Sequence, residues 1–374
     1  RKKTMIIDFH THTFPEKISE KVMDKLGHLS GIEPGTNGAP SGLAASMKEA
    51  GIDYSVNLPV MTSVKQTGSV NEKMIQAKEE LKKEGILTFG GLHPDMENYR
   101  EELKKLADAG ISGIKLHPAY QAVDVDDIRM ERIIDAASEL GLIVLIHAGI
   151  DIGIYDRNYA SVAQILNVIR DVQPEKFVLA HMGGWACWED VERDLAGAPV
   201  WLDTAFTIGP ITPHHEAAPG PYSRITMADE DFLRLARKHG TDRILFATDS
   251  PWQEQPRYVK RFKELGLNDE EYEKIMSQNA LHLLGKKLQP RVWPEAAVLY
   301  LTLIFPKSFS IFRSSDLSHF FSNLIFRIFR GTGSNRKGSR IRSLKIRRLK
   351  ISPTSRSSSA RRKESREYPP NCTD

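Results

Sequence analysis

The chain has 374 residues, of which 40% are hydrophobic and 27% are charged, and a formal net charge of +4 at pH 7. These values describe a soluble globular protein with enough apolar material for one large or two average domains. The longest apolar run, residues 296–305, is about half as long as a bilayer-spanning helix requires. We therefore expect no membrane-spanning segment.

The charge is distributed unevenly along the chain. Residues 290–374 carry 18 Lys and Arg against 5 Asp and Glu, whereas residues 1–289 carry 34 against 43. The main body is therefore acidic and the C-terminal segment strongly basic. One cysteine lies in each region, Cys187 and Cys372. No disulfide framework can form within the body, which suits a reducing cytoplasm.

The N-terminal residues do not have the pattern of a signal peptide. The apolar stretch after Lys3 is short, and Asp8 and His10 interrupt it. We expect Met5 to be the natural start, with residues 1–4 as upstream read-in, and the protein to be cytoplasmic.

Eight short, strongly apolar segments rich in β-branched residues alternate with helix-like stretches. Apolar character without alternation is typical of strands that are covered on both faces in a parallel sheet. The predicted strands are residues 5–10, 54–60, 86–92, 113–117, 142–147, 177–181, 200–204 and 243–248.

Amphipathic helices are predicted between these strands, for example over residues 99–109, 127–140, 161–172 and 230–239. Eight strand–helix units within residues 5–288 fit the size of a (β/α)₈ TIM barrel. A doubly wound sheet is the alternative, but it would concentrate its polar residues at one switch point. Here they recur at strand ends all along the chain. Three loops are long enough to act as lids: residues 13–41, 150–160 and 206–227.

Metal-binding residues follow the predicted strands. His10 and His12 end the first strand, and alternate residues on a strand point to the same side, so both imidazoles can bind one ion. Asp249 follows the eighth strand, and further histidines end the third to sixth strands in order: His93, His117, His147 and His181. The C-terminal strand ends of a barrel meet at one face, where active sites lie. We therefore expect these residues to come together.

The simplest predicted metal site uses His10, His12, His147 and Asp249, with one position left for water. Imidazole nitrogens with a carboxylate suit one Zn²⁺, and Mn²⁺ is the alternative. Such a site is cationic and lowers the pKa of its water. Asp249 would accept the proton of that water. His181 would act as general acid or base, or polarise the substrate carbonyl.

Other residues near the strand ends are candidates for substrate contact. Lys115 precedes His117 by two residues, so both should face the barrel interior, with Lys115 one layer deeper. Lys115 could be a charge partner of the metal or a carboxylated lysine that bridges two metals, and His117 could contact substrate or a second metal. His93 is expected to contact the ligands from behind. Trp185 and Trp252 could wall a pocket for a planar substrate or cap the core.

Five motifs occur together in one order: His10-Thr11-His12, His147-Ala148-Gly149, His181-Met182-Gly183-Gly184, Thr248-Asp249-Ser250-Pro251-Trp252 and Asn279-Ala280-Leu281-His282. The set resembles the amidohydrolase-related family of the amidohydrolase superfamily, in the branch of the aminocarboxymuconate-semialdehyde decarboxylase-like enzymes. The resemblance covers about residues 5–287. It implies a barrel with a divalent metal, usually zinc, held by the predicted ligands. Binuclear members have a bridging Lys or Glu where this chain has His117, which favours a mononuclear site.

Two activities compete under this resemblance. The first expectation is a metal-dependent hydrolase that uses activated water on an amide, ester or lactone carbonyl of a small molecule. The alternative is a non-oxidative decarboxylase of a small aromatic or dienoic carboxylic acid, which uses the same ligands. A non-catalytic metal-binding protein is a second alternative. A homodimer is the default assembly for such a protein.

The basic segment, residues 289–374, has three interpretations. It could be a nucleic-acid-binding tail by its charge, or a membrane-surface anchor by its mixture of Phe, Ile and Arg. We favour non-native read-through, because the predicted helix at 279–285 already closes a barrel. Its low-complexity part cannot bury enough apolar surface to offset its ordering entropy, so we expect disorder. For the barrel itself we expect no nucleic-acid or membrane partner.

Overall fold

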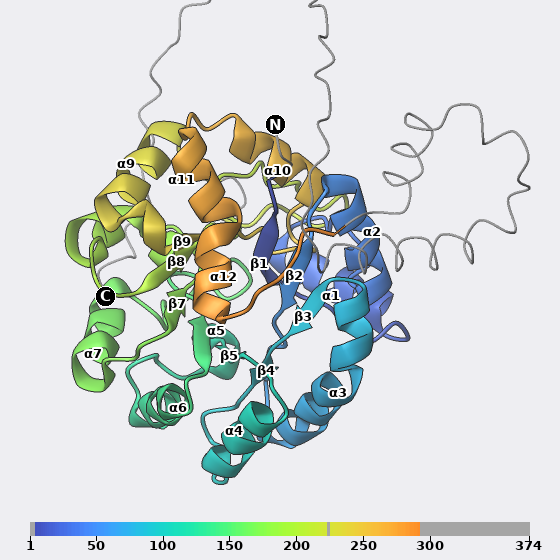
Figure 1. Cartoon of the computed structure of the whole chain (residues 1–374), viewed down its shortest axis with the longest axis vertical. Coiled ribbons are helices and arrows are strands. Elements are labelled where there is room, and N and C mark those ends of the chain that lie inside the picture. Colours follow the sequence, from blue (N-terminus) through green and yellow to red (C-terminus); the bar gives the residue numbers. More distant parts are fainter. Residues whose placement is uncertain (1–3, 223–224, 292–374) are drawn as a thin grey trace, which may run out of the picture. The chain divides into compact units, whose positions relative to one another are not determined.

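The computed structural model describes residues 4–222 and 225–291, and these form a barrel of parallel strands surrounded by helices (Figure 1). The expectations for the basic segment therefore fall outside the described residues, except at positions 289–291. The strands are β1 (Ile7–Thr11), β2 (Tyr54–Asn57), β3 (Ile86–Thr88), β4 (Gly90–Gly91), β5 (Gly113–Leu116), β6 (Ile143–Ile146), β7 (Phe177–Leu179), β8 (Trp201–Asp203) and β9 (Ile244–Leu245).

Neighbouring strands pair in chain order, in two sets, β1-β2-β3 and β4 to β9. The break between the sets lies at Phe89, between β3 and β4, which together form the third of the eight predicted strands. Its first half pairs with β2 through Thr88 and Asn57, and its second half pairs with β5 through Gly90 and Ile114. One continuous segment therefore joins the two sets.

The barrel closes between the first and last strands. The Phe9 N–H donates to the Phe246 carbonyl at 2.9 Å, and the Asp249 N–H donates to the His10 carbonyl at 2.8 Å. A parallel bridge pairs Thr11 with the residue after Asp249. These contacts complete eight parallel strand segments, so the prediction of a (β/α)₈ barrel is confirmed, and the doubly wound alternative is wrong.

Helices connect successive strands, because a parallel pair requires a crossover connection. Their apolar faces pack inwards: in the helix at Ile128–Glu139, Met130, Ile133, Ile134 and Ala137 are buried. The helices are α1 (Ser19–Ser30), α2 (Pro40–Ala50), α3 (Val64–Lys83), α4 (Tyr99–Asp108), α5 (Pro118–Gln121), α6 (Ile128–Glu139), α7 (Val162–Val172), α8 (Trp188–Asp190), α9 (Asp229–His239), α10 (Gln255–Lys263), α11 (Asp269–Glu273) and α12 (Asn279–Leu284).

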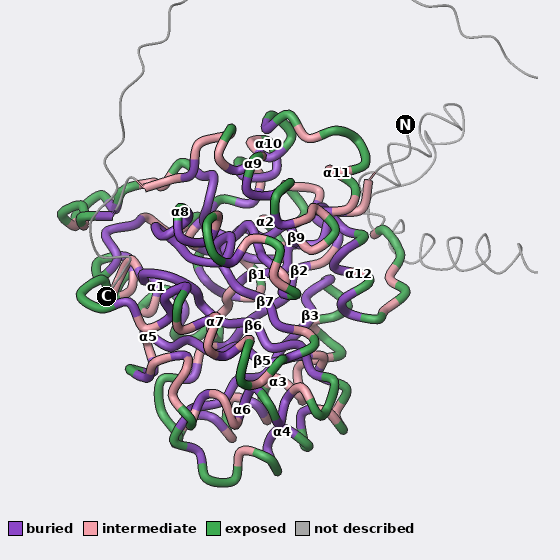
Figure 2. The backbone as a smooth tube through the Cα atoms, turned by 90° about the vertical axis from the view of Figure 1, so that its left-hand side faces the viewer, coloured by how far each residue is buried: buried purple, intermediate pink, exposed green. Residues whose placement is uncertain are grey.

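A hydrophobic core fills the barrel interior. Phe9, Phe89, Leu145 and Val178 come from different strand segments and are fully buried in one cluster. Leu283 of α12 belongs to the same cluster, as expected for a helix that closes the barrel. Figure 2 shows the strands as a buried centre and exposed residues mostly on the surrounding helices and loops.

The first long predicted loop, residues 13–41, is not all loop, because it contains the twelve-residue helix α1. Its buried residues Met23, Gly27 and Ser30 recur every three to four positions, which is the period of a helix with one buried face. Among the helices described, none combines the length and the apolarity that crossing a membrane would require.

Candidate metal centre and active site

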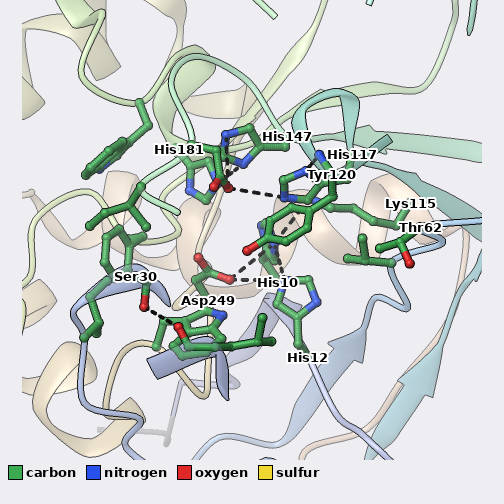
Figure 3. Close-up of a pocket in the computed structure, with 18 of the residues that line it drawn as sticks. His10, His12, Ser30, Thr62, Lys115, His117, Tyr120, His147, His181 and Asp249 are labelled. Carbon is green, nitrogen blue, oxygen red and sulfur yellow. Dashed lines mark hydrogen bonds and ion pairs between the residues drawn. The ribbon is translucent and has the colours of Figure 1, made fainter. Parts of the chain in front are cut away.

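The predicted ligands and the predicted acid–base histidine line one cavity of about 180 Å³ at the C-terminal strand ends (Figure 3). His10 lies in β1. His147 directly follows β6, and His181 lies two residues after β7. Asp249 lies four residues beyond β9. These four side chains are buried, and His12 is half-buried. The barrel topology therefore gathers residues that are far apart in the chain.

Two of these residues adopt left-handed backbone conformations that non-glycine residues rarely take. The φ angle is 60° at His181 and 67° at Asp249. Such strain persists where surrounding contacts fix the chain, and it is frequent at active sites. The His181 carbonyl accepts a bond from the Trp188 indole at 2.9 Å, and the Asp249 carbonyl accepts one from the Trp252 N–H at 2.8 Å.

His10 and His12 face each other with their Nε2 atoms 3.1 Å apart. The other nitrogen of each ring is already occupied: His10 Nδ1 donates to the Asp203 carboxylate at 2.8 Å, and His12 Nδ1 donates to the Leu58 carbonyl at 2.7 Å. Because these partners accept, each neutral ring carries its proton on Nδ1 and a lone pair on Nε2. Asp249 Oδ1 is a third acceptor, 3.5 Å from His10 Nε2 and 3.2 Å from His12 Nε2.

His147 and His181 repeat this arrangement. His181 Nδ1 donates to the Ala205 carbonyl at 2.9 Å, and His147 Nε2 donates to the Ile150 carbonyl at 3.2 Å. The remaining nitrogens, His181 Nε2 and His147 Nδ1, lie 3.0 Å apart and again face each other as lone pairs. The two pairs adjoin, since the ring centres of His10 and His181 are 5.4 Å apart.

Facing lone pairs repel one another unless a proton or a cation lies between them. Burial lowers the pKa of His147 well below the usual range and that of His181 to about 4, which disfavours a bridging proton between these two rings, and burial also lowers the pKa of His10. A divalent cation bound by the lone pairs and a carboxylate would satisfy them. The donor set therefore fits the metal that the sequence implies.

The four predicted ligands do not form one equally tight group. The ligand atoms of His10, His12 and Asp249 lie within 4.8 Å of one another, whereas His147 belongs to a second such group with His117 and Asp151. His181 lies between His147 and the first group: its Nε2 is 3.0 Å from His147 Nδ1, and its ring centre is 5.4 Å from that of His10. The structure thus places a three-residue centre beside a His147–His181 pair.

Two buried charged groups contact His10. Asp203, the last residue of β8, accepts the His10 Nδ1 proton on one oxygen and the backbone N–H groups of His181 and Ala205 on the other, at 2.9 Å and 3.0 Å. Lys115 in β5 places Nζ 3.4 Å from His10 Nε2. Burial raises the pKa of Asp203 and lowers that of Lys115. The nearby carboxylates raise the pKa of Lys115 and so oppose the effect of burial.

His117 lies in the cavity wall next to His147. The two rings stack with centres 4.5 Å apart and planes at 17°. His117 Nε2 is 3.6 Å from Asp151 Oδ2, and His147 Nε2 is 4.0 Å from the same oxygen. Burial raises the pKa of Asp151 to about 6. Of the two roles that the sequence left open for His117, this position allows substrate contact.

Apolar side chains form the rest of the wall, and both predicted tryptophans belong to it. Trp185 is almost fully buried and Trp252 is half-buried. The other large apolar residues of the wall come from helix α1 and from loops: Leu26 lies in α1, and Phe14, Ile32, Val60, Ile152 and Phe206 lie in loops. His93 is not among the described residues that line the cavity, and its Nδ1 accepts the Asp95 N–H at 3.2 Å.

Sequence reasoning did not single out Asp203 or Asp151. Asp203 falls inside the predicted strand 200–204 and could have been found as a carboxylate near a strand end. Asp151 gives no comparable signal, because it lies in a loop whose conformation brings it to His117.

The fold and the converging ligands define the chain as a metal-dependent barrel enzyme. It belongs to the amidohydrolase family, whose family model matches residues 7–286. The resemblance inferred from the sequence is therefore confirmed. No curated protein sequence matches the chain significantly.

Similar solved structures confirm the fold. The 5-carboxyvanillate decarboxylase of Sphingomonas paucimobilis has a TM-score of 0.56 at 14% identity, over 76% of this chain and 100% of that one. The 2,6-dihydroxybenzoate decarboxylase of Rhizobium has a TM-score of 0.55 at 15% identity, over 76% and 99%. A dihydroxybenzoic acid decarboxylase of Polaromonas sp., solved with bound manganese and the inhibitor 2-nitroresorcinol, has a TM-score of 0.54 at 15% identity, over 76% and 97%.

Proposed function

We propose that the chain is a divalent-metal-dependent, non-oxidative decarboxylase of a small aromatic or dienoic carboxylic acid. The convergence of lone pairs from His10, His12 and Asp249 carries this proposal, because it provides a cation site at a cavity with largely apolar walls. Hydrolysis of an amide, ester or lactone, the first expectation from the sequence, would use the same groups. The similar barrels that act on 5-carboxyvanillate and dihydroxybenzoate favour decarboxylation instead.

A divalent metal would be held by His10, His12 and Asp249, with His147 as the fourth predicted ligand. When bound, it would supply a fixed positive charge that binds and polarises the substrate carboxylate. Zn²⁺ suits the nitrogen-rich donor set, and Mn²⁺ is the competing choice because one similar barrel contains it.

The chain's own residues would bind the acid and exclude water. Lys115 offers a buried ammonium group beside His10 to the substrate carboxylate. The walls that include Trp185 and Phe206 keep the reacting bond away from solvent. A low dielectric favours the reaction, because the charged carboxylate leaves as neutral CO₂.

The reaction consumes one proton, which a group in the cavity must deliver. The proton bonds to the carbon that carries the carboxylate, and the C–C bond then breaks, returning its electron pair to the ring or diene as CO₂ leaves. His181 is poorly placed to give this proton, because its Nδ1–H is held by the Ala205 carbonyl and its Nε2 faces His147. We assign the donor role to Asp249, which lines the cavity and would recover its proton from solvent.

The test is product analysis with metal-loaded protein and a panel of benzoic and dienoic acids in ¹⁸O-labelled water. We expect CO₂ in an amount equal to the acid consumed, no solvent oxygen in the product, and solvent hydrogen at the former carboxylate carbon. Solvent oxygen in the product would instead establish hydrolysis. Asp249→Asn should lower kcat by about 10²–10⁴-fold, the range for loss of a general acid.

Metal analysis tests the cation site independently of activity. We expect about one equivalent of metal per chain and weaker binding in His147→Ala. Unchanged metal content and stability in that variant would favour a non-catalytic role for the cluster. Two equivalents, with one lost in Lys115→Ala or His117→Ala, would overturn the mononuclear site.

A further inference from the structure

Asp151 presents a carboxylate oxygen to the cavity beside the metal centre. Its Oδ1 accepts the backbone N–H groups of Gly153 at 2.8 Å and Ile154 at 2.9 Å, which fix the side chain in a tight turn. Within the described part of the chain, Oδ2 accepts no hydrogen bond, although the residue is only 6% exposed and lines the cavity. Because Oδ2 faces the cavity while Oδ1 is already bonded, a donor group of a ligand could bond to Oδ2.

His117 directs a proton toward the same space. Its Nδ1 accepts the backbone N–H of Tyr120 at 3.4 Å, at the start of α5, so the proton of the neutral ring is on Nε2. This Nε2–H is 3.6 Å from Asp151 Oδ2, longer than a good hydrogen bond. A ligand atom beside the two groups can therefore bond to both. The Tyr120 ring packs edge-on against the His117 ring, with centres 4.5 Å apart, at the same cavity (Figure 3).

The spacing of His117, His147 and Asp151 would suit a metal, but the proton positions do not. A ligating nitrogen must present a lone pair. His147 Nε2 carries a proton that it donates to the Ile150 carbonyl, and His117 Nε2 carries one as well. The site therefore fits a group that accepts from an N–H and donates to a carboxylate.

We propose that Asp151 and His117 form the subsite that binds a hydroxyl or amino substituent of the substrate acid and selects against a second carboxylate. A hydroxyl would donate to Asp151 Oδ2 and accept from His117 Nε2–H. A second carboxylate has no proton to donate and would meet the charge of Asp151. This inference rests on the proposed function, because it takes the substrate to be an acid whose carboxylate binds at the metal centre.

The charges around the cavity agree with this selection. Among the described residues that line it, Lys115 is the only Lys or Arg, and its Nζ lies beside His10. One ammonium group at the metal centre suits one carboxylate, and a second carboxylate at the Asp151 end would have no cationic side chain as a partner.

Asp151→Asn separates a specificity role from a structural one. The N–H groups of Gly153 and Ile154 require an acceptor, so the amide oxygen would take the place of Oδ1 and the NH₂ group the place of Oδ2. A donor would then stand where the wild-type protein has an acceptor. The subsite should lose affinity for a hydroxyl proton and gain affinity for a carboxylate.

The measurement is calorimetric binding of hydroxybenzoates, aminobenzoates, benzoate and benzenedicarboxylates to Mn²⁺-loaded protein. Wild type should bind at least one hydroxy- or aminobenzoate about 10-fold more tightly than benzoate or the matching dicarboxylate. Asp151→Asn should weaken that ligand by about 10–100-fold, the value of a hydrogen bond to a charged group, and strengthen the dicarboxylate. A preference of wild type for the dicarboxylate, or the same ranking in the variant, would overturn the proposal.

Two further variants exclude a general structural effect. His117→Asn retains a short acceptor for the Tyr120 N–H but removes the Nε2 donor, so it should weaken the hydroxybenzoate without improving the dicarboxylate. Asp156→Asn makes the same change at an exposed position of the same loop and should leave every affinity unchanged. Equal losses in all three variants would contradict the specificity role.

The failure of this inference is distinguishable from that of the proposed function, because binding does not require turnover. Inverted ligand preference without CO₂ release would support the subsite and refute the decarboxylase. CO₂ release with unchanged specificity in Asp151→Asn would do the reverse. Loss of a second metal equivalent in Asp151→Asn would show a metal site and overturn the subsite.

Discussion

The nitrogen that His10 offers to a metal is determined by Asp203, a residue 193 positions away in the chain. Two backbone N–H groups hold one oxygen of Asp203, so its other oxygen must receive the His10 Nδ1 proton. A partner of this kind fixes both the tautomer and the orientation of a ligating histidine. The metal centre therefore depends on a residue that does not belong to the predicted ligand set.

Asp203→Asn should lower metal affinity by about 10–100-fold, the typical effect of losing such a partner. The amide oxygen would satisfy the two N–H groups, and its NH₂ group would then face His10 Nδ1. The His10 proton would move to Nε2 and block the metal-binding lone pair. Metal titration measures this change, with Asp156→Asn as an exposed control. Unchanged affinity with a correctly folded variant would show that Asp203 does not set the tautomer.

The types of the ligands and their positions on the strands could be predicted from the sequence. The hydrogen bonds that fix the orientation and the tautomer of these ligands could not. His10, His12 and Asp249 follow apolar runs, and strand ends of a barrel meet at one face. Asp151 reaches the cavity through a turn held by backbone N–H groups. Nothing in the spacing of residues along a loop specifies that turn.

At the scale of elements, Gly149 joins the segments that follow β6 and β7. It pairs with Trp185 in a parallel bridge and has a φ of +85°. A Cβ atom at Gly149 would lie 2.3 Å from the Trp185 backbone nitrogen. The loop that carries Asp151 begins here, and His147 lies two residues earlier, so backbone contact at this point positions both.

Gly149→Ala should destabilise the fold by more than about 2 kcal/mol and weaken metal binding, because a side chain at a positive φ also meets backbone that cannot move freely. Gly141→Ala is the matched control: its φ is +67°, but its Cβ would have nothing within 4 Å. That variant should lose only about 1 kcal/mol, the conformational cost alone. Denaturant unfolding measures both. Equal losses would show that the contact with Trp185 is unimportant.

His239, the last residue of α9, connects that helix to the segment before β8. Its Nε2 donates to the Val200 carbonyl at 3.0 Å, and its Nδ1 accepts the Gly197 N–H at 3.2 Å. Burial lowers its pKa to about 4. Between pH 4 and 6.5 the unfolded chain therefore binds one proton more than the folded chain at this residue, and the residue makes stability fall as the pH decreases.

His239→Gln should remove this pH dependence. Across that pH window, the slope of unfolding free energy against pH should be smaller than in wild type by about 1.4 kcal/mol per pH unit. Denaturant unfolding at several pH values measures the slope, and above pH 7 the difference between the two proteins should be constant. Parallel slopes throughout the window would show that His239 titrates normally in the folded protein.

Element positions were more predictable than element boundaries. All eight predicted strands correspond to strand segments, because strands covered on both faces require continuous apolar runs. Phe89 divides the third strand between its two neighbours, a property of barrel closure that no local pattern contains. Helix α1 was missed because its short buried face, with small residues such as Gly27 and Ser30, gives a weak apolar period.

At the scale of the whole molecule, the barrel makes contacts with residues beyond its predicted end. The sequence suggests Leu288, but the structure shows barrel contacts just beyond it. Tyr54 donates to the Gln289 carbonyl at 3.0 Å, and the Arg291 N–H donates to Asp53 Oδ1 at 2.7 Å. We therefore propose that the autonomous domain extends to Arg291, and that the basic segment beyond it contributes nothing to folding or metal binding.

Two truncations test this boundary. Deleting residues 292–374 should leave the unfolding free energy, the metal content and CO₂ release unchanged, because it removes none of the described contacts of the barrel. Deleting residues 289–374 should cost about 1–3 kcal/mol, since it removes one hydrogen bond of Tyr54 and one of Asp53, each worth about 0.5–1.5 kcal/mol. Loss of folding or activity in the protein that ends at Arg291 would make the basic segment an integral part of the enzyme. The same result would argue against the read-through interpretation, because a non-native segment has no contacts that were selected to support the barrel.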